Sequence, residues 1–285
     1  MTNSDRHLSL VKDFHKLHES GCFVIPNPFD IGSAVYLHEL GFKALATSSA
    51  GFAFTRGLPD DVNVIGLDVM LDHFREVSAA IPLPVNADFQ NGYANEPDAV
   101  AENVGLCVAT GVAGLSIEDR IPGESRQLYD DDLALKRVKA ARKAIDESGI
   151  PVVLTARCEV YLVQNPNSFD FAIRRLTSFA EAGADCLYAP GVTEPAEIEA
   201  IVKAVAPRAV NVLAFRPDPN LSLARLTDLG VRRISVGSAL ARVAWSAFMK
   251  AASDIAETGE FTSLAENASF AELNALFKQS IERAT

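Results

Sequence analysis

The sequence predicts a (β/α)8 barrel, or TIM barrel, and three observations lead to this fold class. Eight short apolar runs recur along the 285 residues, each too short for a helix and typical of a strand buried on both faces. Segments with helical spacing separate the runs, and no linker interrupts the alternation. A glycine precedes every second run, at positions 41, 111, 183 and 230, where it ends a helix in the left-handed conformation. A doubly wound open sheet is the competing architecture, but it rarely has eight strands at such even spacing.

The eight runs define the predicted strands. We expect them at residues 23–26, 44–48, 85–88, 115–118, 152–157, 186–189, 210–214 and 234–237. Apolar stripes at helical spacing predict helices over 67–81, 133–145, 173–179 and 198–205. Asp30, Ser168 and Ser222 stand where an N-cap side chain accepts a hydrogen bond from the first turn of a helix.

The chain continues well beyond the last predicted strand. We expect a helix over 239–256, a break at Gly259 and a final helix over 269–283. The final helix carries an apolar stripe of Phe270, Leu273, Leu276, Phe277 and Ile281. A closed barrel does not need this stripe, so either a neighbouring subunit or the chain's own barrel must bury it. Residues 1–285 are therefore predicted to form one barrel domain, with 239–285 as a helical extension.

Composition excludes several classes of partner. The net charge is −11 and no basic stripe is present, so we expect no nucleic-acid binding and no attraction to anionic membranes. No apolar run approaches the ~20 residues that a membrane helix requires, and the polar N-terminus does not resemble a signal peptide. The four cysteines form no CxxC pair, which favours a reducing cytoplasm. All five histidines lie in about the first quarter, which weakens a zinc or triad interpretation.

Charged residues gather at the predicted strand ends, where barrel enzymes place their active sites. Asp88 and Glu118 end adjacent predicted strands, and Arg157 ends the next one. Two carboxylates at close range repel each other unless a cation lies between them. Ligands that are all oxygen, without a nearby histidine, favour Mg²⁺ or Mn²⁺ over zinc. The planar fork of Arg157 suits a carboxylate or phosphonate group, and the alternative is that these three residues form only an ion-pair network.

Alternation along a strand separates the neighbours of these residues from the site. Cys158 follows Arg157 and should point out of the barrel, and Asp119 stands in the same relation to the carboxylate before it. We expect Asp119 to pair with Arg120 or with a residue of the following loop. Glu159 shares the direction of Arg157 but lies past the strand end, so a role in the site and a role in packing both stay open.

Short motifs at these strand ends resemble the phosphoenolpyruvate mutase/isocitrate lyase superfamily. They occur in order at residues 48–51, 57–60, 87–88 with 92–93, 117–120, 155–159 and 182–185. The resemblance covers nearly the whole chain. It implies Mg²⁺, a small carboxylate or 2-oxo acid substrate, and a homodimer or homotetramer that exchanges the last helix between subunits. Known activities include carbon–carbon lyases, an oxaloacetate decarboxylase and enzymes that make or break carbon–phosphorus bonds.

The resemblance also implies roles for individual residues. Asp88 and Glu118 match acidic residues of the metal site, Arg157 matches the arginine that grips the substrate, and Asp60 matches a loop aspartate behind the metal. We therefore expect Asp60, Arg157 and Glu118 to be catalytic. The loop that contacts the substrate carboxylate matches Ser48, Ser49, Ala50 and Gly51.

Two departures from the pattern bear on the activity. The superfamily usually has Asp-Ala-Asp at the third strand, whereas this chain has Asn86-Ala87-Asp88 followed by a longer turn. An amide oxygen is a weaker metal ligand than a carboxylate. The loop over 121–127 lacks the Cys, Lys and His that lyases of isocitrate and methylisocitrate carry there, which argues against those two activities. This loop keeps the character of a lid, with Pro122 and Gly123 as its hinge.

Three functions remain open from the sequence. The first is a Mg²⁺-dependent lyase that cleaves a carbon–carbon bond of a 2-oxo acid, or decarboxylates it, through an enolate stabilised by the cation. The second is a phosphonopyruvate-type mutase or hydrolase, which would need Ser125, Arg126 or Gln127 to reach the phosphonyl group. The third is a catalytically lapsed barrel that binds a small acid, a hypothesis motivated by Asn86 and by the missing lid residues.

Overall fold

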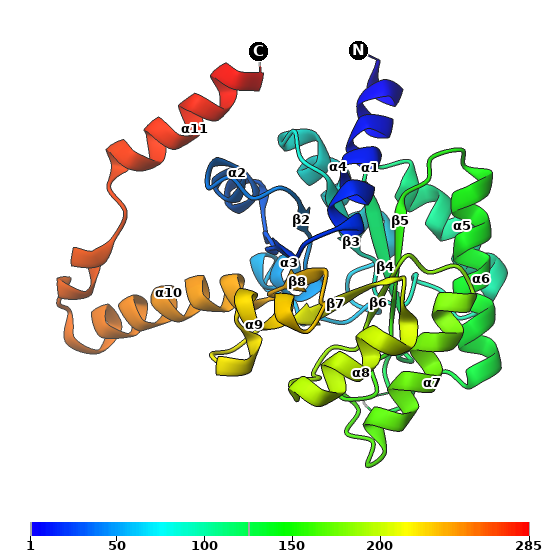
Figure 1. The fold of residues 1–285 in the computed structure, drawn as a ribbon. Helices are drawn as coiled ribbons and strands as arrows, with labels where there is room; N and C mark the ends of the chain where they lie inside the picture. Colours follow the sequence, from blue (N-terminus) through cyan, green and yellow to red (C-terminus); the bar gives the residue numbers. More distant parts are fainter. Residues whose placement is uncertain (1, 125, 285) are drawn as a thin grey trace.

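The computed structural model describes residues 2–124 and 126–284, which form the predicted (β/α)8 barrel (Figure 1). Within these ranges, eight parallel strands lie in the order β1-β8-β7-β6-β5-β4-β3-β2. The N–H group of Ala46 donates to the Pro26 carbonyl at 3.1 Å, which links the two end strands and nearly closes the barrel. The strands are β1 (Phe23–Ile25), β2 (Leu45–Ala46), β3 (Val85–Asp88), β4 (Gly114–Glu118), β5 (Val153–Arg157), β6 (Cys186–Tyr188), β7 (Ala209–Leu213) and β8 (Arg233–Ser235).

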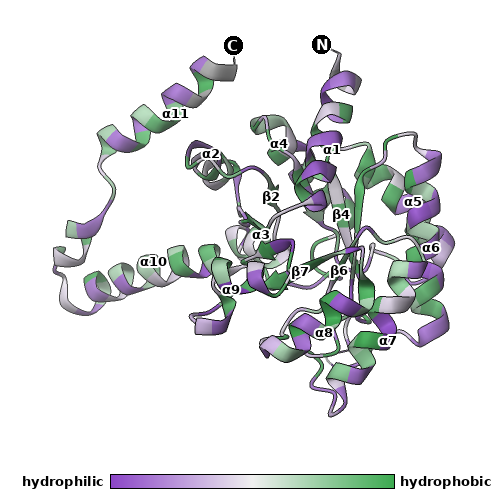
Figure 2. Cartoon of the chain, viewed as in Figure 1, coloured by the Kyte–Doolittle hydropathy of each residue, from purple (hydrophilic) through white to green (hydrophobic). Residues whose placement is uncertain are grey.

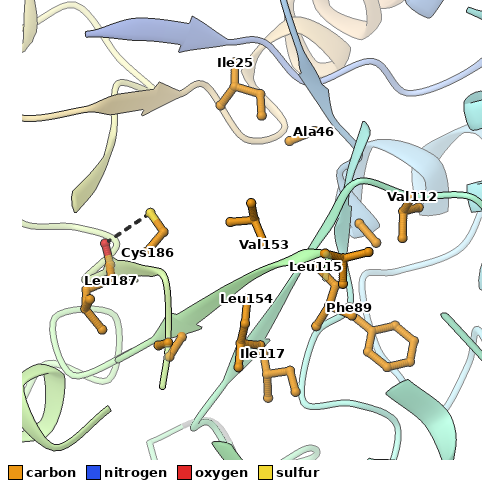
Figure 3. Packing of buried hydrophobic residues seen from close by; sticks show 14 of the residues in the cluster. Ile25, Ala46, Phe89, Val112, Leu115, Ile117, Val153, Leu154, Cys186 and Leu187 are labelled. Atoms are coloured by element: carbon orange, nitrogen blue, oxygen red, sulfur yellow. Dashed lines mark hydrogen bonds between the residues drawn. The ribbon is translucent and has the colours of Figure 1, made fainter. Parts of the chain in front are cut away.

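Every predicted strand run overlaps one of these strands, so the strand predictions are confirmed within two residues at each end. β2 is shorter than its predicted run because the chain leaves the sheet at Thr47 to form the site described below. The side chains of Leu115, Val153 and Leu154 are fully buried on the two faces of the sheet (Figure 3). This packing holds the carboxyl ends of the strands in fixed positions.

Helices cover the outside of the barrel (Figure 1). They are α1 (Asn3–Glu19), α2 (Ile31–Glu39), α3 (Ser49–Thr55), α4 (Leu67–Ala80), α5 (Pro97–Val108), α6 (Asp131–Glu147), α7 (Ser168–Glu181), α8 (Pro195–Val205) and α9 (Leu223–Asp228). The sequence did not predict α1. Most residues of this helix are polar, so the fully buried Val11 and Phe14 produce no clear apolar stripe. His7 and His15 of α1 bond the carbonyls of Val112 and Pro151, so this helix lies across the amino ends of β4 and β5.

The predicted helix ends are mostly confirmed. The side chains of Asp30 and Ser222 accept hydrogen bonds from the first turns of α2 and α9, as expected. The prediction for Ser168 is wrong, because Asn167 is the N-cap of α7 and the Ser168 hydroxyl instead donates to the Asn165 carbonyl at 2.5 Å. Gly41, Gly111, Gly183 and Gly230 have positive φ angles between 84° and 97°, which confirms their predicted role at helix ends.

The C-terminal extension projects from the barrel as α10 (Ala239–Thr258), a short 3₁₀ turn and α11 (Phe270–Ala284) (Figure 1). Gly259 ends α10 in the left-handed conformation, as predicted. Both helices carry hydrophobic residues along their length (Figure 2), and some of these side chains are uncovered, since Phe248 is 62% exposed and Phe270 is 86% exposed. The extension contacts its own barrel where α10 meets α3 and where Phe277 of α11 approaches Gly32 of α2, while much of its apolar surface stays open.

Two further features concern the whole described chain. None of its helices is long and apolar enough to cross a bilayer. Its four cysteines, Cys22, Cys107, Cys158 and Cys186, form no disulfide with one another.

Candidate active site

Three charged residues lie together at the carboxyl end of the barrel. Asp88, Glu118 and Arg157 are the last residues of β3, β4 and β5. Glu118 and Arg157 are partners in the register of β4 and β5, and Asp88 pairs with Ser116 of β4. The structure therefore brings together the three residues that the sequence predicted at this rim.

The guanidinium of Arg157 is the centre of this cluster. Its Nη1 lies 2.7 Å from Asp88 Oδ1, its Nη2 lies 3.1 Å from Glu118 Oε2, and its Nε lies 2.9 Å from Glu159 Oε1. Burial lowers the pKa of Arg157, but the surrounding carboxylates outweigh this effect and raise the pKa well above its usual value. The ion-pair network considered from the sequence is thus present, and Glu159, whose role the sequence left open, belongs to it.

The cluster holds more negative than positive charge. Two effects raise the pKa of Asp60 above its usual value. The first is burial of the carboxyl group, and the second is the negative charge of the nearby Asp88. Burial raises the pKa of Glu118 to about 8, against the opposing effect of Arg157 and with the support of Glu159. Four carboxylates thus influence a single buried guanidinium, and such an excess attracts a further cation.

The predicted substrate loop adjoins Asp88. The N–H of Ser49 donates to Asp88 Oδ2 at 2.9 Å, and the Asp88 N–H donates to Thr47 Oγ1 at 2.9 Å. The Ser48 hydroxyl accepts from the Gly51 N–H at 3.1 Å and caps α3. Little space is left for a side chain at Gly51, because an added Cβ would stand 3.0 Å from the Phe29 Cβ. The loop thus fixes the second oxygen of Asp88, and its residues Ser48, Ser49 and Ala50 line a cavity while Gly51 packs behind them.

Gln90 is a residue of this site that the sequence did not single out. Its Nε2 lies 3.4 Å from Asp60 Oδ1, and its carbonyl accepts from the Glu118 N–H at 2.8 Å. Gln90 has a φ of 46°, which is uncommon for a residue other than glycine. The longer turn after Asp88, seen in the sequence as a departure, places the side-chain amide of Gln90 beside Asp60 and its backbone carbonyl beside the Glu118 N–H. Its positive φ is the kind of local strain that often marks a functional site.

Two cavities meet at the cluster and share Ser49, Asp60 and Arg157. The outer cavity, about 320 Å³, lies beneath the lid and contacts Glu118 and Glu159. The inner cavity, about 170 Å³, reaches into the barrel and contacts Asp88. Ligand pockets commonly measure ~300–1,000 Å³, so the outer cavity is at the lower limit of this range and the inner cavity is below it, which suits a small acid.

The lid is a short hairpin after β4. Arg120 and Leu128 form an antiparallel bridge, and the Ile121 N–H donates to the Gln127 carbonyl at 3.0 Å. Arg120, Pro122 and Gly123 line the outer cavity. Arg126 and Gln127 are exposed and do not line it, and Ser125 lies outside the described residues.

Cys158 and Asp119, which the alternation of side chains along a strand predicted to point outward, do lie outside the barrel. Cys158 is fully buried behind the strand, as predicted. The predicted partner of Asp119 is wrong, since Asp119 pairs with Arg175 of α7 at 3.0 Å and not with Arg120 or the lid. Its other oxygen accepts from the Glu159 N–H at 2.9 Å. The long side chain of Arg175 crosses from α7 to the strand, a contact between distant residues that local sequence does not reveal.

The side chains of the cluster offer the type of ligand atom that a divalent cation prefers. All candidate ligands are carboxylate oxygens, and their excess charge matches a hard cation such as Mg²⁺. Within residues 2–124 and 126–284, no group of three acidic, histidine or cysteine side chains is arranged to ligate a metal ion. Asp88 and Glu118 each direct one carboxylate oxygen to Arg157 instead. Asn86 directs its Oδ1, which has no partner, toward Gly114. The residues thus fit a cation in charge and donor type, without help from Asn86.

The fold and the site define the chain as a (β/α)8-barrel protein with acidic and arginine side chains at the carboxyl ends of β3, β4 and β5. Within that class, the family model for phosphoenolpyruvate phosphomutase matches residues 14–256. The chain belongs to this family and to the phosphoenolpyruvate mutase/isocitrate lyase superfamily, as the motifs predicted.

Individual proteins show the same relationship. A Burkholderia cenocepacia J2315 protein described as a lyase/mutase is 42% identical, with a TM-score of 0.90 over 96% of this chain and 97% of that chain. Oxaloacetate acetylhydrolase with its product oxalate is 25% identical, with a TM-score of 0.85 over 97% of each chain. An oxaloacetate decarboxylase of Rhodopseudomonas palustris (strain ATCC BAA-98 / CGA009) is 31% identical over 64% of this chain and 63% of its own length. The superfamily also includes 2-methylisocitrate lyases and a phosphonomutase.

Proposed function

We propose that this protein is a lyase that breaks a carbon–carbon bond, by cleavage or decarboxylation, in a small 2-oxo acid or related carboxylate. The observation that carries the proposal is the Arg157 cluster, in which buried carboxylates outnumber the guanidinium that they surround. A charge excess of this kind serves a bound cation and an anionic substrate better than it serves the fold.

Asp88 and Glu118 would hold a divalent cation, Mg²⁺ with Mn²⁺ as a substitute, which when bound supplies positive charge to the enolate oxygen of the substrate. Arg157 orients both carboxylates, at 2.7 Å and 3.1 Å. Its remaining N–H groups are left for a substrate carboxylate. The loop of Ser48, Ser49, Ala50 and Gly51 borders the inner cavity and closes the site on that side.

Asp60 is the proposed proton carrier, and Glu118 takes part as a ligand of the cation. Asp60 lines the outer cavity, and burial raises its pKa above the usual value of an aspartate. A carboxyl group with a raised pKa is better able to donate a proton to the carbon left by bond cleavage. Gln90 holds Asp60 toward the cavity through its amide group.

The relatives make oxaloacetate the first substrate to test, since the names of two of them state that they act on it. We expect Mg²⁺-dependent turnover in a screen of oxaloacetate, phosphonopyruvate and alkylated malates and citrates. Turnover of phosphonopyruvate alone would replace this proposal with the mutase or hydrolase. Loss of all turnover, together with no Mg²⁺ or Mn²⁺ binding, would favour the lapsed barrel. Of the described lid residues, Arg126 and Gln127 are exposed and do not line the outer cavity, so these two give no support to carbon–phosphorus chemistry.

We also propose that the protein assembles as a homodimer or homotetramer in the cytoplasm, with α11 packed on a neighbouring subunit. The support is the exposure of the apolar stripe, with Phe270 86% and Ile281 67% exposed in the single chain. Light scattering should show an oligomer, and deletion of 269–285 should cause aggregation or dissociation. A well-behaved monomer of the full chain would overturn the assembly.

A further inference from the structure

A second arginine lies deep inside the barrel, below the cluster. Arg233 is the first residue of β8, and only 3% of it is exposed. It stands in the same row of register partners as Asn211, Tyr188 and Arg157, on successive strands from β8 to β5. No function discussed so far uses this guanidinium.

Every partner of Arg233 is a neutral group. Its Nε donates to Asn211 Oδ1 at 2.9 Å, and its Nη2 donates to Thr155 Oγ1 at 2.9 Å. Its Nη1 lies 3.4 Å from His18 Nε2. His18 Nδ1 lies 2.7 Å from the Phe14 carbonyl, so Nδ1 carries the proton and Nε2 accepts. Arg233 thus has three hydrogen-bonded neighbours that fix its position and none that neutralises its charge.

An isolated buried charge is costly, which is why buried arginines normally pair with a carboxylate. No acidic side chain of the described chain lies within 4.0 Å of Arg233. Among the described residues, Arg137 is the only other fully buried arginine that has no carboxylate partner, since Arg175 pairs with Asp119. Arg137 differs, because it bonds backbone carbonyls of the turn after β3 and borders no cavity described above. Arg233 borders the inner cavity of about 170 Å³.

The inner cavity extends from the cluster to Arg233. Arg157 and Asp88 border its upper part, and Asn86, Asn211 and Arg233 border it within the barrel. A polar cavity with an unbalanced cation at its inner end is suited to an anion that enters from the cluster.

We propose that Arg233 binds the second carboxylate of a dicarboxylic substrate and so selects 2-oxo or 2-hydroxy dicarboxylates over monocarboxylates. The inference rests on the proposed function for the position of the first carboxylate. Three carboxylates already surround Arg157, so its charge is largely balanced within the protein, whereas the charge of Arg233 is not. Arg233 is therefore a specificity-determining residue.

L-malate and L-lactate provide a matched pair of probes, because malate is lactate with one added carboxylate. Calorimetry in Mg²⁺ should show that the wild-type protein binds malate at least tenfold more tightly than lactate. Arg233→Met should reduce this preference to less than twofold and leave the affinity for lactate unchanged. A preference that survives Arg233→Met would overturn the proposal, as would a wild-type protein without any preference.

Asn211→Asp tests the same idea without removing the arginine. The substitution is nearly isosteric and places a carboxylate 2.9 Å from Arg233 Nε, which gives the cation a partner inside the protein. We expect the malate preference to fall as in Arg233→Met while thermal stability holds or rises. The exposed Asn267→Asp adds the same charge and should change neither quantity. An Asn211→Asp protein that keeps the full preference contradicts the proposal even if Arg233→Met fails to fold.

The binding assay and the turnover assay separate the two proposals. An Arg233-dependent preference for malate without turnover of any 2-oxo acid would sustain the carboxylate site and overturn the lyase. Turnover of oxaloacetate that Arg233→Met leaves unchanged in kcat/KM would sustain the lyase and overturn the carboxylate site.

Discussion

Glu118 is the last residue of β4 and Asp119 follows it, yet the two acids belong to different parts of the molecule. Glu118 points into the barrel and pairs with Arg157, while Asp119 points outward and pairs with Arg175 of α7. Burial raises the pKa of both acids, that of Glu118 to about 8 and that of Asp119 to about 7. Neither the type of group nor the direction of the pKa shift therefore distinguishes the two positions.

The balance of charge does distinguish them. Asp119 shares Arg175 only with Asp131, whose side chain is 77% exposed, and it also accepts a backbone hydrogen bond. Glu118 shares Arg157 with two other largely buried carboxylates. A balanced buried pair joins a helix to a strand, whereas an unbalanced cluster leaves charge for a ligand. Loss of an acid should therefore cost stability on the outside of the barrel and activity on the inside.

Asp88→Ala should produce the largest change, a loss of more than about a hundredfold in kcat/KM, because a proposed cation ligand disappears. Thermal stability should hold or rise, since the substitution relieves repulsion within the cluster. Steady-state kinetics and thermal melting check the two parts. An unfolded Asp88→Ala protein would show that the cluster is structural and that the comparison with Asp119 fails.

Asp119→Ala should have the opposite signature. The substitution leaves Arg175 buried with only an exposed acid for a partner, which lowers the free energy of unfolding by about 3–5 kcal/mol. Denaturant titration measures this loss, and Asp131→Ala is the matched control that should cost at most about 1 kcal/mol. Equal effects of the two substitutions would remove the distinction between the pairs.

Arg157→Lys keeps the positive charge but loses the planar fork. If Arg157 also grips the substrate, the lost charge-assisted hydrogen bond costs about 1.5–3 kcal/mol, or tenfold and more in kcat/KM. Kinetics on the substrate found in the screen give the answer. A decrease of less than roughly threefold would mean that Arg157 only balances the carboxylates, and its role in substrate binding would be withdrawn.

His18 gives the smallest predicted effect, and it concerns pH. Burial, and then the charge of Arg233, lowers the pKa of His18 from 6.5 to about 3. The unfolded chain therefore binds more protons than the folded chain between pH 3 and 6.5, so His18 lowers stability as the pH falls through this window. His18→Gln should flatten the acid side of the stability curve by at most about 1.4 kcal/mol per pH unit. Denaturant titrations at pH 5.5 and 6.5 measure this slope, and an unchanged slope, equal to that of the control His38→Gln, would contradict it.

The barrel was largely predictable because its signals are local. Short apolar runs between helical segments and glycines at helix ends define all eight strands. The charged residues at the carboxyl ends of the strands were predictable from the same pattern, because side chains alternate along a strand and Arg157 therefore points inward while Cys158 points outward. The helix α1 was missed because its core contacts, Val11 and Phe14, are few among polar residues.

The rest depends on contacts between distant residues. Nothing near Asp119 indicates Arg175, which lies 56 residues further along the chain. The inward position of Gln90 depends on a left-handed residue in a turn of irregular length. The neutral surroundings of Arg233 involve β5, β7 and α1 together, so no single segment reveals that its charge is unbalanced.

Calorimetric titration of Mg²⁺ and oxalate into wild-type protein and Asp88→Ala tests the central claim most directly. Oxalate resembles the enolate of a 2-oxo acid, so a site built for that chemistry should bind both components together. We predict that oxalate binds with one-to-one stoichiometry only when Mg²⁺ is present, and that Asp88→Ala abolishes the binding in a folded protein. Absence of Mg²⁺ and oxalate binding to the wild type, or equal binding to Asp88→Ala, would contradict the account.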